Sequence, residues 1–358
     1  MLIVHNAFNG RFADSPRAVH AALVASGRDL DQVWLQDPRF APTFPAGVRT
    51  VPIGSPAAVQ ALEAADVVVN NTHVQLDRWS KSAHTFYLQT WHGTPLKRIH
   101  RSALSVPGEE VMTQLDEDIA RWDLLLTQSP TATRLLRAAF DYAGPVLESG
   151  YPRNDLLSAP DAGERRRSLR VALGVAEDQT AVLYAPTYRD DQVDDPDAPD
   201  GLDPRALLDR LGPGHVLLLR DHYYLFRRPA HAGGPNLVDV SGHPEVADLY
   251  LAADVLVTDY SSAMFDFAVT GKPILLYLYD LDRFRGELRG FALDPEAEAP
   301  GPVLRNQDEL AEALVDLDGS RNAYAAAYAA FRARHCALED GQASSRVVQA
   351  LLTATGTR

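Results

Sequence analysis

Short apolar runs rich in Val, Ile and Leu alternate with longer segments of helical periodicity along most of the chain. The alternation runs from Leu2 to Gly150 and starts again at Ala181. This rhythm is typical of a parallel sheet with helices on both faces, so the sequence predicts an α/β fold with two doubly wound, Rossmann-like halves. The expected strands are 2–5, 66–70, 85–91, 123–128, 145–150, 181–187, 215–220, 236–241, 254–260 and 273–279, and the expected helices are 15–26, 94–100, 129–140, 244–253, 262–271, 325–335 and 344–352.

The length of 358 residues, 46% of them hydrophobic, also favours two domains, because a domain usually has roughly 100 to 200 residues. A segment rich in Pro, Ala, Gly and charged residues between Asp155 and Leu169 is the expected boundary. We predict an N-terminal domain at 1–157, a C-terminal domain at 166–335 and a C-terminal helix within 336–358. The acidic, Pro-rich stretch 189–204 is expected to be a loop beside the crevice of the second domain.

The composition limits the cellular compartments and the classes of partner that are expected for this protein. Cys336 is the single cysteine, which excludes an internal disulfide and favours a reducing, cytoplasmic compartment. The apolar runs are much shorter than the ~20 residues of a membrane-spanning helix, and the opening is too short for a signal peptide. The net charge of -14 argues against nucleic acid as a partner. A local cluster of basic residues and helix N-termini could still bind phosphate.

Polar residues follow several of the predicted strands, where a doubly wound sheet binds its ligands. Cations and hydroxyl groups at these positions would suit a bound diphosphate. They are His92, Gly93 and Thr94 after strand 85–91, Arg189 after 181–187, Arg220 and His222 at the end of 215–220, and Asp259, Tyr260, Ser261 and Ser262 at the end of 254–260.

Two of these positions are also predicted helix starts. Thr94 with Pro95 fits an N-cap followed by the first helical residue, and Ser261 or Ser262 fits the N-cap of a helix that ends at Gly271. A helix N-terminus that faces a crevice can bind an anion. Serines in this context usually only cap the helix, and the neighbouring cations are what favour an anion site.

His92 is the main candidate for chemistry. A single histidine in an apolar neighbourhood is more often structural than catalytic, although its near-neutral pKa allows base chemistry. Its place between a buried strand and a Gly-Thr-Pro turn favours a function, and Gly93 would let a substrate approach the backbone. His5 and His73 lack such a turn, and each is interpreted either as structural or as a supporting residue that contacts the site residues.

The sequence lacks the motifs that mark several common nucleotide-binding, hydrolytic and metal sites. Neither a GxGxxG nor a Walker A motif follows a predicted strand, and a GxSxG elbow does not occur. This weakens the dehydrogenase, P-loop kinase and hydrolase interpretations. The chain also has no HExxH or CxxC motif, so no metal site is expected.

At the residues singled out above, the sequence resembles the CDP-glycerol glycerophosphotransferases that prime and polymerise wall teichoic acid and related capsule polymers. The resemblance extends from residue 8 to residue 303 in the order of the family. Its matching stretches are FNGRFADSPRAV at 8–19, QTWHGTPLKRI at 89–99, SGYPRNDLL at 149–157, YAPTYRDD at 184–191, LRDH at 219–222, DLYLAADVLVTDYSSAMFDFAVTGKPILLYLYDLDRF at 248–284 and RGFALDPEAEAPGPV at 289–303.

The resemblance implies a GT-B-like arrangement, in which two Rossmann-like domains face each other across a cleft and the nucleotide binds mainly to the second. Tyr223 is a departure, because the family often has Pro after the second histidine. The implied catalytic residues are His92 and His222, the implied donor-binding residues are Thr187, Arg189, Arg220, Asp259, Ser261, Ser262 and Asp266, and the implied acceptor or cleft residues are Gly93, Thr94, Lys97 and Arg153.

The implied reaction moves glycerol phosphate, or a related polyol phosphate, from a CDP-activated donor to a hydroxyl of a teichoic-acid-like or capsule polymer, or of a lipid-linked acceptor. His92 would accept the proton of that hydroxyl, and CMP would leave. CDP-glycerol or CDP-ribitol would be the donor substrate, and no cofactor is expected. Two alternatives stay open at this point, namely a GT-B glycosyltransferase that uses a nucleotide sugar and a catalytically silent module that binds a nucleotide or a polymer.

The basic segment 96–101 suggests peripheral contact with anionic lipid on the cytoplasmic face of a membrane. A solvated helix face explains the same residues equally well. The sequence does not decide between the glycerol and the ribitol donor, or between a primase and a polymerase. It is equally silent on the acceptor and on the oligomeric state.

Overall fold

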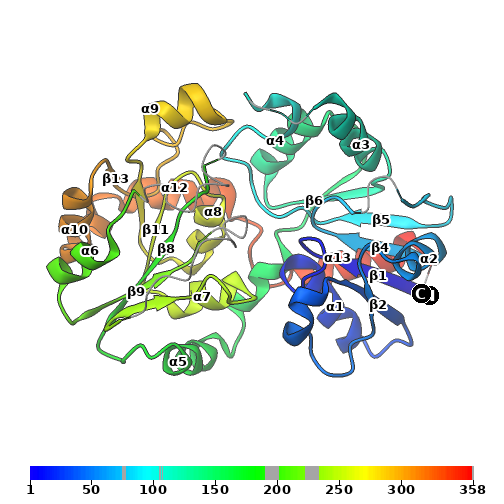
Figure 1. Ribbon diagram of the computed structural model, residues 1–358, viewed down its shortest axis with the longest axis horizontal. Helices are drawn as coiled ribbons and strands as arrows, with labels where there is room; N and C mark the ends of the chain where they lie inside the picture. The colour runs from blue at the N-terminus through cyan, green and yellow to red at the C-terminus, as the bar shows by residue number, and fades with distance from the viewer. Residues whose placement is uncertain (75–77, 105, 107, 190–200, 222–233, 357–358) are drawn as a thin grey trace. The chain divides into compact units, whose positions relative to one another are not determined.

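The computed structural model describes the chain except residues 75–77, 105, 107, 190–200, 222–233 and 357–358. The described residues form two compact units. The N-terminal unit comprises Met1–Thr94, Val106–Ser158 and Ala337–Arg358, and the C-terminal unit comprises Pro95–Ser105 and Ala159–Cys336. Each unit is built around its own parallel sheet (Figure 1).

The sheet of the N-terminal unit has the strand order β3-β2-β1-β4-β5-β6-β7 in the part of the chain described. The central strands β1 and β4 each begin with a run of three aliphatic residues and are almost completely buried, as expected for strands covered on both faces. Strands β2 and β3 were not predicted from the sequence. The strands are β1 (Leu2–Asn6), β2 (Asp31–Gln36), β3 (Thr50–Pro52), β4 (Val67–Asn70), β5 (Phe86–Gln89), β6 (Leu124–Thr127) and β7 (Val146–Glu148).

The C-terminal helix α13 (Ala343–Ala354) packs within the N-terminal unit (Figure 1). Its apolar residues Val347 and Leu351 share one core with Ile3 of β1 and Val67 of β4. The chain therefore returns to its first domain at the end. The other helices of this unit are α1 (Asp14–Ala25), α2 (Pro56–Ala64), α3 (Glu109–Ile119) and α4 (Pro130–Phe140), with the 3-10 segments η1 (Pro38–Thr43) and η3 (Pro152–Ser158).

The sheet of the C-terminal unit has the order β10-β9-β8-β11-β12-β13 over the residues described. In both sheets the order reverses direction beside the first strand, at β1/β4 and at β8/β11, which is the doubly wound topology predicted from the sequence. The strands are β8 (Thr180–Ala185), β9 (His215–Leu219), β10 (Leu237–Asp239), β11 (Val255–Thr258), β12 (Ile274–Tyr277) and β13 (Val303–Leu304).

Of the helices of the C-terminal unit, α7, α8 and α12 lie in segments predicted as helical, whereas α5, α6, α9, α10 and α11 were not predicted. One of them, α7, ends at Ala252 and leads directly into β11. They are α5 (Ala162–Ala172), α6 (Pro204–Leu211), α7 (Val246–Ala252), α8 (Ala263–Phe267), α9 (Leu281–Arg283), α10 (Gln307–Val315), α11 (Leu317–Ala323) and α12 (Ala325–His335), with η2 (His100–Ser102), η6 (Ala268–Thr270) and η7 (Phe284–Leu288).

The predicted helix at 94–100 is wrong, because residues 94–99 form no helix and His100 begins the short 3-10 segment η2. The carbonyl oxygen of Leu96 accepts hydrogen bonds from Ala292 N at 2.8 Å and Leu293 N at 3.2 Å, and Lys97 forms an antiparallel bridge with Phe291. Thr94 does not cap a helix; its Oγ1 donates to Oε1 of Gln128 at 2.9 Å. Pairing with a distant segment has replaced the local helix.

Two segments expected to lack regular structure contain helices. Within 155–169, where the sequence predicts a boundary, α5 begins at Ala162, and Arg165 and Arg166 bind Asp248 and Asp254 of the C-terminal unit. In the acidic stretch 189–204, α6 begins at Pro204; residues 190–200 lie outside the described part. Every helix of the described residues is too short or too polar to span a bilayer.

Candidate active site

Buried amide side chains line the carboxyl edge of the N-terminal sheet at the β1/β4 reversal. Asn6, at the end of β1, donates from Nδ2 to Oδ1 of Asn70 at 2.8 Å, and Asn70 donates in turn to the hydroxyl of Tyr87 at 2.8 Å. Gln89, at the end of β5, donates to the carbonyl oxygen of Thr72 at 2.8 Å. These bonds hold the loops that leave β4 and β5.

Trp91 makes the turn that presents His92. Its φ of 50° lies in the left-handed region, which is unusual for a bulky residue and marks a conformation that the surroundings must hold. The Trp91 N–H donates to Oε1 of Gln89 at 2.9 Å, and its ring packs edge-on against Phe140. Gly93 follows with a φ of 152°. The chain therefore turns sharply between the end of β5 at Gln89 and His92.

His92 is held as a neutral base by its surroundings. Its Nδ1 lies 2.6 Å from the carbonyl oxygen of Asn71. A carbonyl oxygen only accepts, so Nδ1 carries the proton and Nε2 keeps a free lone pair. Burial lowers the pKa of His92 to about 4. At neutral pH the ring can thus accept a proton at Nε2.

A buried ion pair lies next to His92. Nη1 of Arg153 is 3.3 Å from Oδ1 and 3.4 Å from Oδ2 of Asp14. Only 2% of the Arg153 side chain and 7% of the Asp14 side chain are exposed. The Arg153 guanidinium also lies over the ring of Tyr151, at 4.3 Å from its centroid. Burial has the largest influence on the pKa of His92, followed by the Asn71 hydrogen bond. Asp14, which raises this pKa, and Arg153, which lowers it, come next.

A second polar group occupies the corresponding reversal in the C-terminal unit. The guanidinium of Arg189 donates to Asp259 at 2.9 Å and to Asp280 at 2.7 Å. Asp259 also accepts from the backbone N–H of Thr187 at 2.8 Å, and Asp280 from the hydroxyl of Tyr260 at 3.0 Å. Arg189 thus ties together the loops that follow β8, β11 and β12.

The serines after β11 are arranged as the sequence predicts. Oγ of Ser261, the residue before the N-cap position of the short helix α8, accepts from Ala263 N at 3.2 Å, and the continuation η6 is followed by Gly271 with a left-handed φ of 73°. Ser262 is half-buried and makes no capping bond. Asp266 is buried within α8. The two serines therefore stand at the same sheet edge as Arg189.

Arg220 and Lys97 make contacts with other residues. Nη1 of Arg220 donates to the carbonyl oxygens of Val240 at 3.1 Å and His243 at 2.9 Å. Nζ of Lys97 lies 5.6 Å from the ring centroid of Tyr188.

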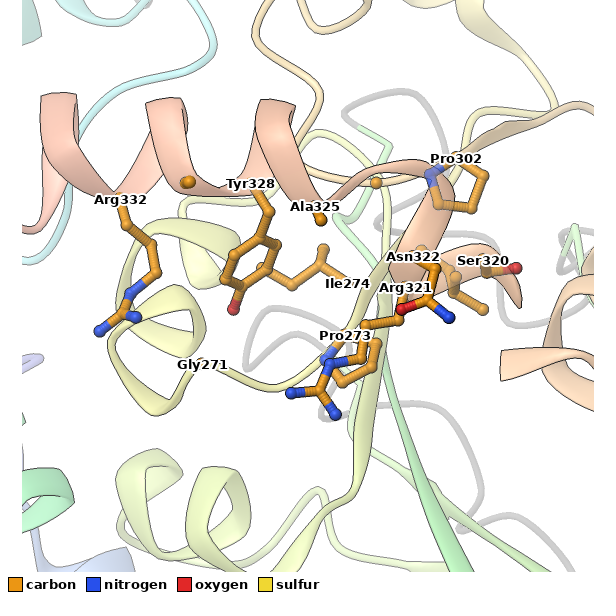
Figure 2. Close-up of a pocket in the computed structure, with 13 residues that line it drawn as sticks. Gly271, Pro273, Ile274, Pro302, Ser320, Arg321, Asn322, Ala325, Tyr328 and Arg332 are labelled. Atoms are coloured by element: carbon orange, nitrogen blue, oxygen red, sulfur yellow. The ribbon is translucent and has the colours of Figure 1, made fainter. Parts of the chain in front are cut away.

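A cavity of about 360 Å³ lies at the opposite, amino-terminal edge of the C-terminal sheet. Its lining includes Pro273, just before β12, and Tyr328 of α12 (Figure 2). The hydroxyl of Tyr328 donates to the carbonyl oxygen of Lys272 at 2.7 Å. The predicted donor residues follow the carboxyl ends of the strands, so this cavity is separate from the candidate site.

Comparison with known proteins identifies the family. Residues 1–353 match the family described as CDP-Glycerol:Poly(glycerophosphate) glycerophosphotransferase. The chain belongs to this family. The resemblance noted from the sequence is therefore confirmed, and so is the prediction of a glycerophosphotransferase enzyme.

Relatives of this glycerophosphotransferase act on teichoic acid. The teichoic acid glycerol-phosphate transferase of Staphylococcus aureus is 36% identical over 98% of this chain and 92% of its own length. The teichoic acid poly(glycerol phosphate) polymerase of Bacillus subtilis is 31% identical over 98% of this chain, which spans only 48% of that protein. The structure of a variant of the wall teichoic acid polymerase TagF soaked with CDPG superimposes with a TM-score of 0.89, at 31% identity, and covers 99% of this chain and 89% of that one. The GT-B-like fold is thereby confirmed.

The predicted site residues of the glycerophosphotransferase fall into two groups, one in each unit. The first contains His92, Gly93, Thr94 and Arg153, and the second contains Thr187, Arg189, Asp259, Ser261, Ser262 and Asp266. Their roles stay predictions. His222, the second predicted catalytic residue, lies outside the described residues.

The sequence reasoning missed three residues that the structure places in contact with, or in the same unit as, the predicted site residues. Asn71 and Asp280 come directly after the predicted strands 66–70 and 273–279, so the rule that located His92 would have found them too. Asp14 lies within the stretch at 8–19 that resembles the family. Its proximity to His92 could not be read from the sequence, because the two residues are far apart in the chain.

Proposed function

We propose that this glycerophosphotransferase moves glycerol phosphate from CDP-glycerol to a hydroxyl of a teichoic-acid-type polymer and releases CMP, with His92 as the general base. The observation that carries the proposal is the hydrogen bond from Nδ1 of His92 to the carbonyl oxygen of Asn71. It leaves Nε2 as the basic atom of a ring that is neutral at pH 7.

In the proposed step the acceptor hydroxyl oxygen attacks the β-phosphorus of the donor. The bond between this phosphorus and the bridging oxygen breaks, and CMP leaves with that oxygen. Nε2 of His92 takes the hydroxyl proton, so the ring becomes an imidazolium. A general base typically contributes about 10²- to 10⁴-fold to the rate, and positioning of the phosphates supplies much of the rest.

The donor phosphates are proposed to bind at the carboxyl edge of the C-terminal sheet, with Ser261 and Ser262 as contacts. Arg220 and His222 complete this part of the proposal. Arg189 is engaged by Asp259 and Asp280 and is nearly enclosed. This supports a role for Arg189 in shaping the loops that hold the donor, in addition to its predicted contact with phosphate.

A donor panel tests the reaction. The protein is incubated with CDP-glycerol, CDP-ribitol or a UDP-sugar and a short poly(glycerol phosphate) acceptor, with and without a lipid-linked end, and the released CMP or UDP is measured. The proposal expects CMP from CDP-glycerol. Release of UDP alone would indicate the glycosyltransferase alternative, and tight CMP binding without release from any donor would indicate a silent binding module.

A substitution at His92 tests the base. His92→Ala should lower the rate of CMP release by about 10²- to 10⁴-fold and leave CMP binding, measured by calorimetry, nearly unchanged. His84→Ala is the matched control, because His84 is exposed in the same unit. An unchanged rate in the His92 variant would refute the assignment of the base.

Peripheral contact with a membrane is a further part of the proposal. It is supported by the basic segment 96–101, in which Arg98 and Arg101 are exposed. Co-sedimentation with vesicles that contain anionic lipid should weaken when Lys97 and Arg98 are changed to Glu, because this removes the attraction to the lipid head groups. Equal co-sedimentation of both forms would count against this contact.

A further inference from the structure

The cavity of about 360 Å³ in the C-terminal unit takes no part in the proposed transfer. It is lined by residues at the amino-terminal ends of β12 and β13 and by residues of α11 and α12. Its volume lies within the range of about 300–1,000 Å³ that is usual for small-molecule sites. Strand β12, whose four residues span roughly 13 Å, separates it from the sheet edge that carries the proposed donor residues. The cavity is therefore large enough for a ligand and distinct from the donor site.

The charges in this lining are all of one sign. Among the described residues that form it, Arg321 and Arg332 are cationic and none carries a carboxylate. The whole chain has a net charge of -14, so its overall field repels anions. A lining that is locally positive in such a chain is complementary to a negatively charged ligand.

The two guanidinium groups keep their donors for a ligand. The side chain of Arg321, at the end of α11, makes neither a hydrogen bond nor an ion pair with the described residues. Arg332 makes a single long hydrogen bond within the same part of the chain, from Nη2 to the carbonyl oxygen of Val269 at 3.5 Å. By contrast, Arg166 and Arg189 of the same unit bind carboxylates. A guanidinium has five N–H donors, so most of those of Arg321 and Arg332 are available.

The turn at Gly271 brings Arg332 and Tyr328 to the same wall of the cavity. Nη1 of Arg332 lies against this turn, where a Cβ on Gly271 would be 3.8 Å from it. The hydroxyl of Tyr328, one helical turn earlier in α12, donates to the carbonyl oxygen of Lys272 at 2.7 Å. Figure 2 shows both side chains projecting from α12 toward the loop at Gly271 and Pro273. This loop therefore holds the aromatic ring on the same side of α12 as the cation.

The rest of the lining is mostly apolar. Pro273, Ile274 and Pro302 supply aliphatic surface, and Asn322 supplies an amide that can both donate and accept. An inorganic anion gains nothing from apolar surface, and a polyol phosphate has little apolar body of its own. A few polar groups around an apolar floor are typical of a site for a small organic molecule. The ligand that fits both features is an organic anion with a flat, apolar ring.

We propose that this cavity is a second nucleotide site, which binds a pyrimidine nucleoside monophosphate. The phosphate lies between Arg321 and Arg332, because guanidinium groups match phosphate oxygens in geometry and charge. The base covers Pro273 and Pro302 and pairs with the Asn322 amide. CMP is the nucleotide that the proposed reaction supplies at every turnover, so the identity of the ligand rests on the proposed function.

Calorimetric titration with CMP tests the site. Wild-type protein should bind two CMP molecules per chain, one at the donor site and one in the cavity. Arg321→Gln/Arg332→Gln should bind one, because loss of the charged contacts weakens the cavity site by about tenfold for each arginine. Its kcat/KM for CMP release should stay within about twofold of the wild type, since the cavity lies a strand's length from the donor residues. Equal numbers of bound CMP molecules in the two proteins overturn the inference.

Three further ligands test which chemistry the cavity recognises. Inorganic phosphate lacks the nucleoside, cytidine lacks the phosphate, and hexyl phosphate replaces the nucleoside with an aliphatic chain. Each should bind in the cavity at least about tenfold more weakly than CMP, with the double variant as the blank. Inorganic phosphate that binds as tightly as CMP would show a simple anion site, and hexyl phosphate that does so would show that the base is not recognised. Either outcome overturns the assignment to a nucleotide.

Two matched variants distinguish the cavity from a general effect of charge. Arg167→Gln/Arg210→Gln removes the same charge from exposed positions of α5 and α6 and should still bind two CMP molecules. Ala325→Phe keeps both arginines of the cavity but fills its space, and should bind one. Loss of the second CMP in the surface variant, or its retention in Ala325→Phe, overturns the inference.

The two proposals fail differently. Wild-type protein that releases no CMP from CDP-glycerol refutes the proposed function, and CMP binding in the cavity is then still decided by the same titrations. Active wild-type protein that binds no more CMP than Arg321→Gln/Arg332→Gln refutes this inference alone.

Discussion

Replacing Arg189 with Ala should destabilise the C-terminal unit far more than replacing an exposed arginine. The side chain of Arg189 is 3% exposed, and its partners Asp259 and Asp280 are 2% and 11% exposed. The substitution removes the guanidinium and leaves two carboxylates close together in a mostly dry environment. They keep their bonds to the N–H of Thr187 and the hydroxyl of Tyr260 but lose their counter-charge.

The expected loss in the free energy of unfolding is about 3–5 kcal/mol, the range seen when one partner of a buried ion pair is removed. The loss should be larger at pH 8 than at pH 5. In the variant the two buried carboxylates repel each other without a counter-charge. Protonation at low pH relieves this repulsion, so the native state of the variant becomes less stable as the pH rises.

Urea unfolding should be followed by circular dichroism and by tryptophan fluorescence in parallel. The four tryptophans lie at 34, 79, 91 and 122, all within the N-terminal unit. Fluorescence therefore reports this unit, while circular dichroism reports both. The Arg189 variant should lose part of its dichroism at lower urea than the wild type.

Arg210→Ala is the matched control, because Arg210 also pairs with two carboxylates. Its side chain is 41% exposed, and those of Asp308 and Glu312 are 86% and 72% exposed. Exposed pairs contribute about 1 kcal/mol or less, so this variant should unfold almost as the wild type does. A loss for Arg189→Ala as small as that for Arg210→Ala would refute the reasoning.

Two further changes test the packing of the two sheets. Complete burial lowers the pKa of His5 to about 3, so the unfolded chain binds the proton more readily than the folded chain. The free energy of unfolding should therefore fall as the pH drops below about 6.5. The urea midpoint of His5→Phe should depend less on pH between 7.5 and 5 than that of the wild type, and an equal dependence would contradict this. A Cβ on Gly301 would lie 1.8 Å from the carbonyl oxygen of Ile274, so Gly301→Ala should lower the free energy of unfolding by about 1–3 kcal/mol. Gly214→Ala, where a Cβ meets nothing within 4 Å, should change it by no more than about 0.5 kcal/mol, and equal losses would contradict the expected clash.

Local patterns in the sequence were enough to predict much of the architecture. The aliphatic runs that became β1, β4, β8, β9, β11 and β12 are continuous because both faces of these strands are buried. The cap that Ser129 forms at α4, and the hydrogen bond that Ser261 accepts from Ala263 N, also act within a few residues of their own position. The short edge strand β3 has too little apolar character to stand out, which explains why it was missed.

The sequence by itself therefore determined the two parallel sheets, the family and the place of His92 at a strand end, since strand periodicity and motifs are local properties. Only the tertiary structure decided what surrounds these residues. Residues 96–98 pair with 290–293 instead of forming a helix, and Arg189 meets carboxylates that lie 70 and 91 residues further along the chain. The Asp14–Arg153 pair joins residues 139 positions apart. Contacts of this kind depend on how distant elements pack together in three dimensions, which a local sequence pattern does not encode.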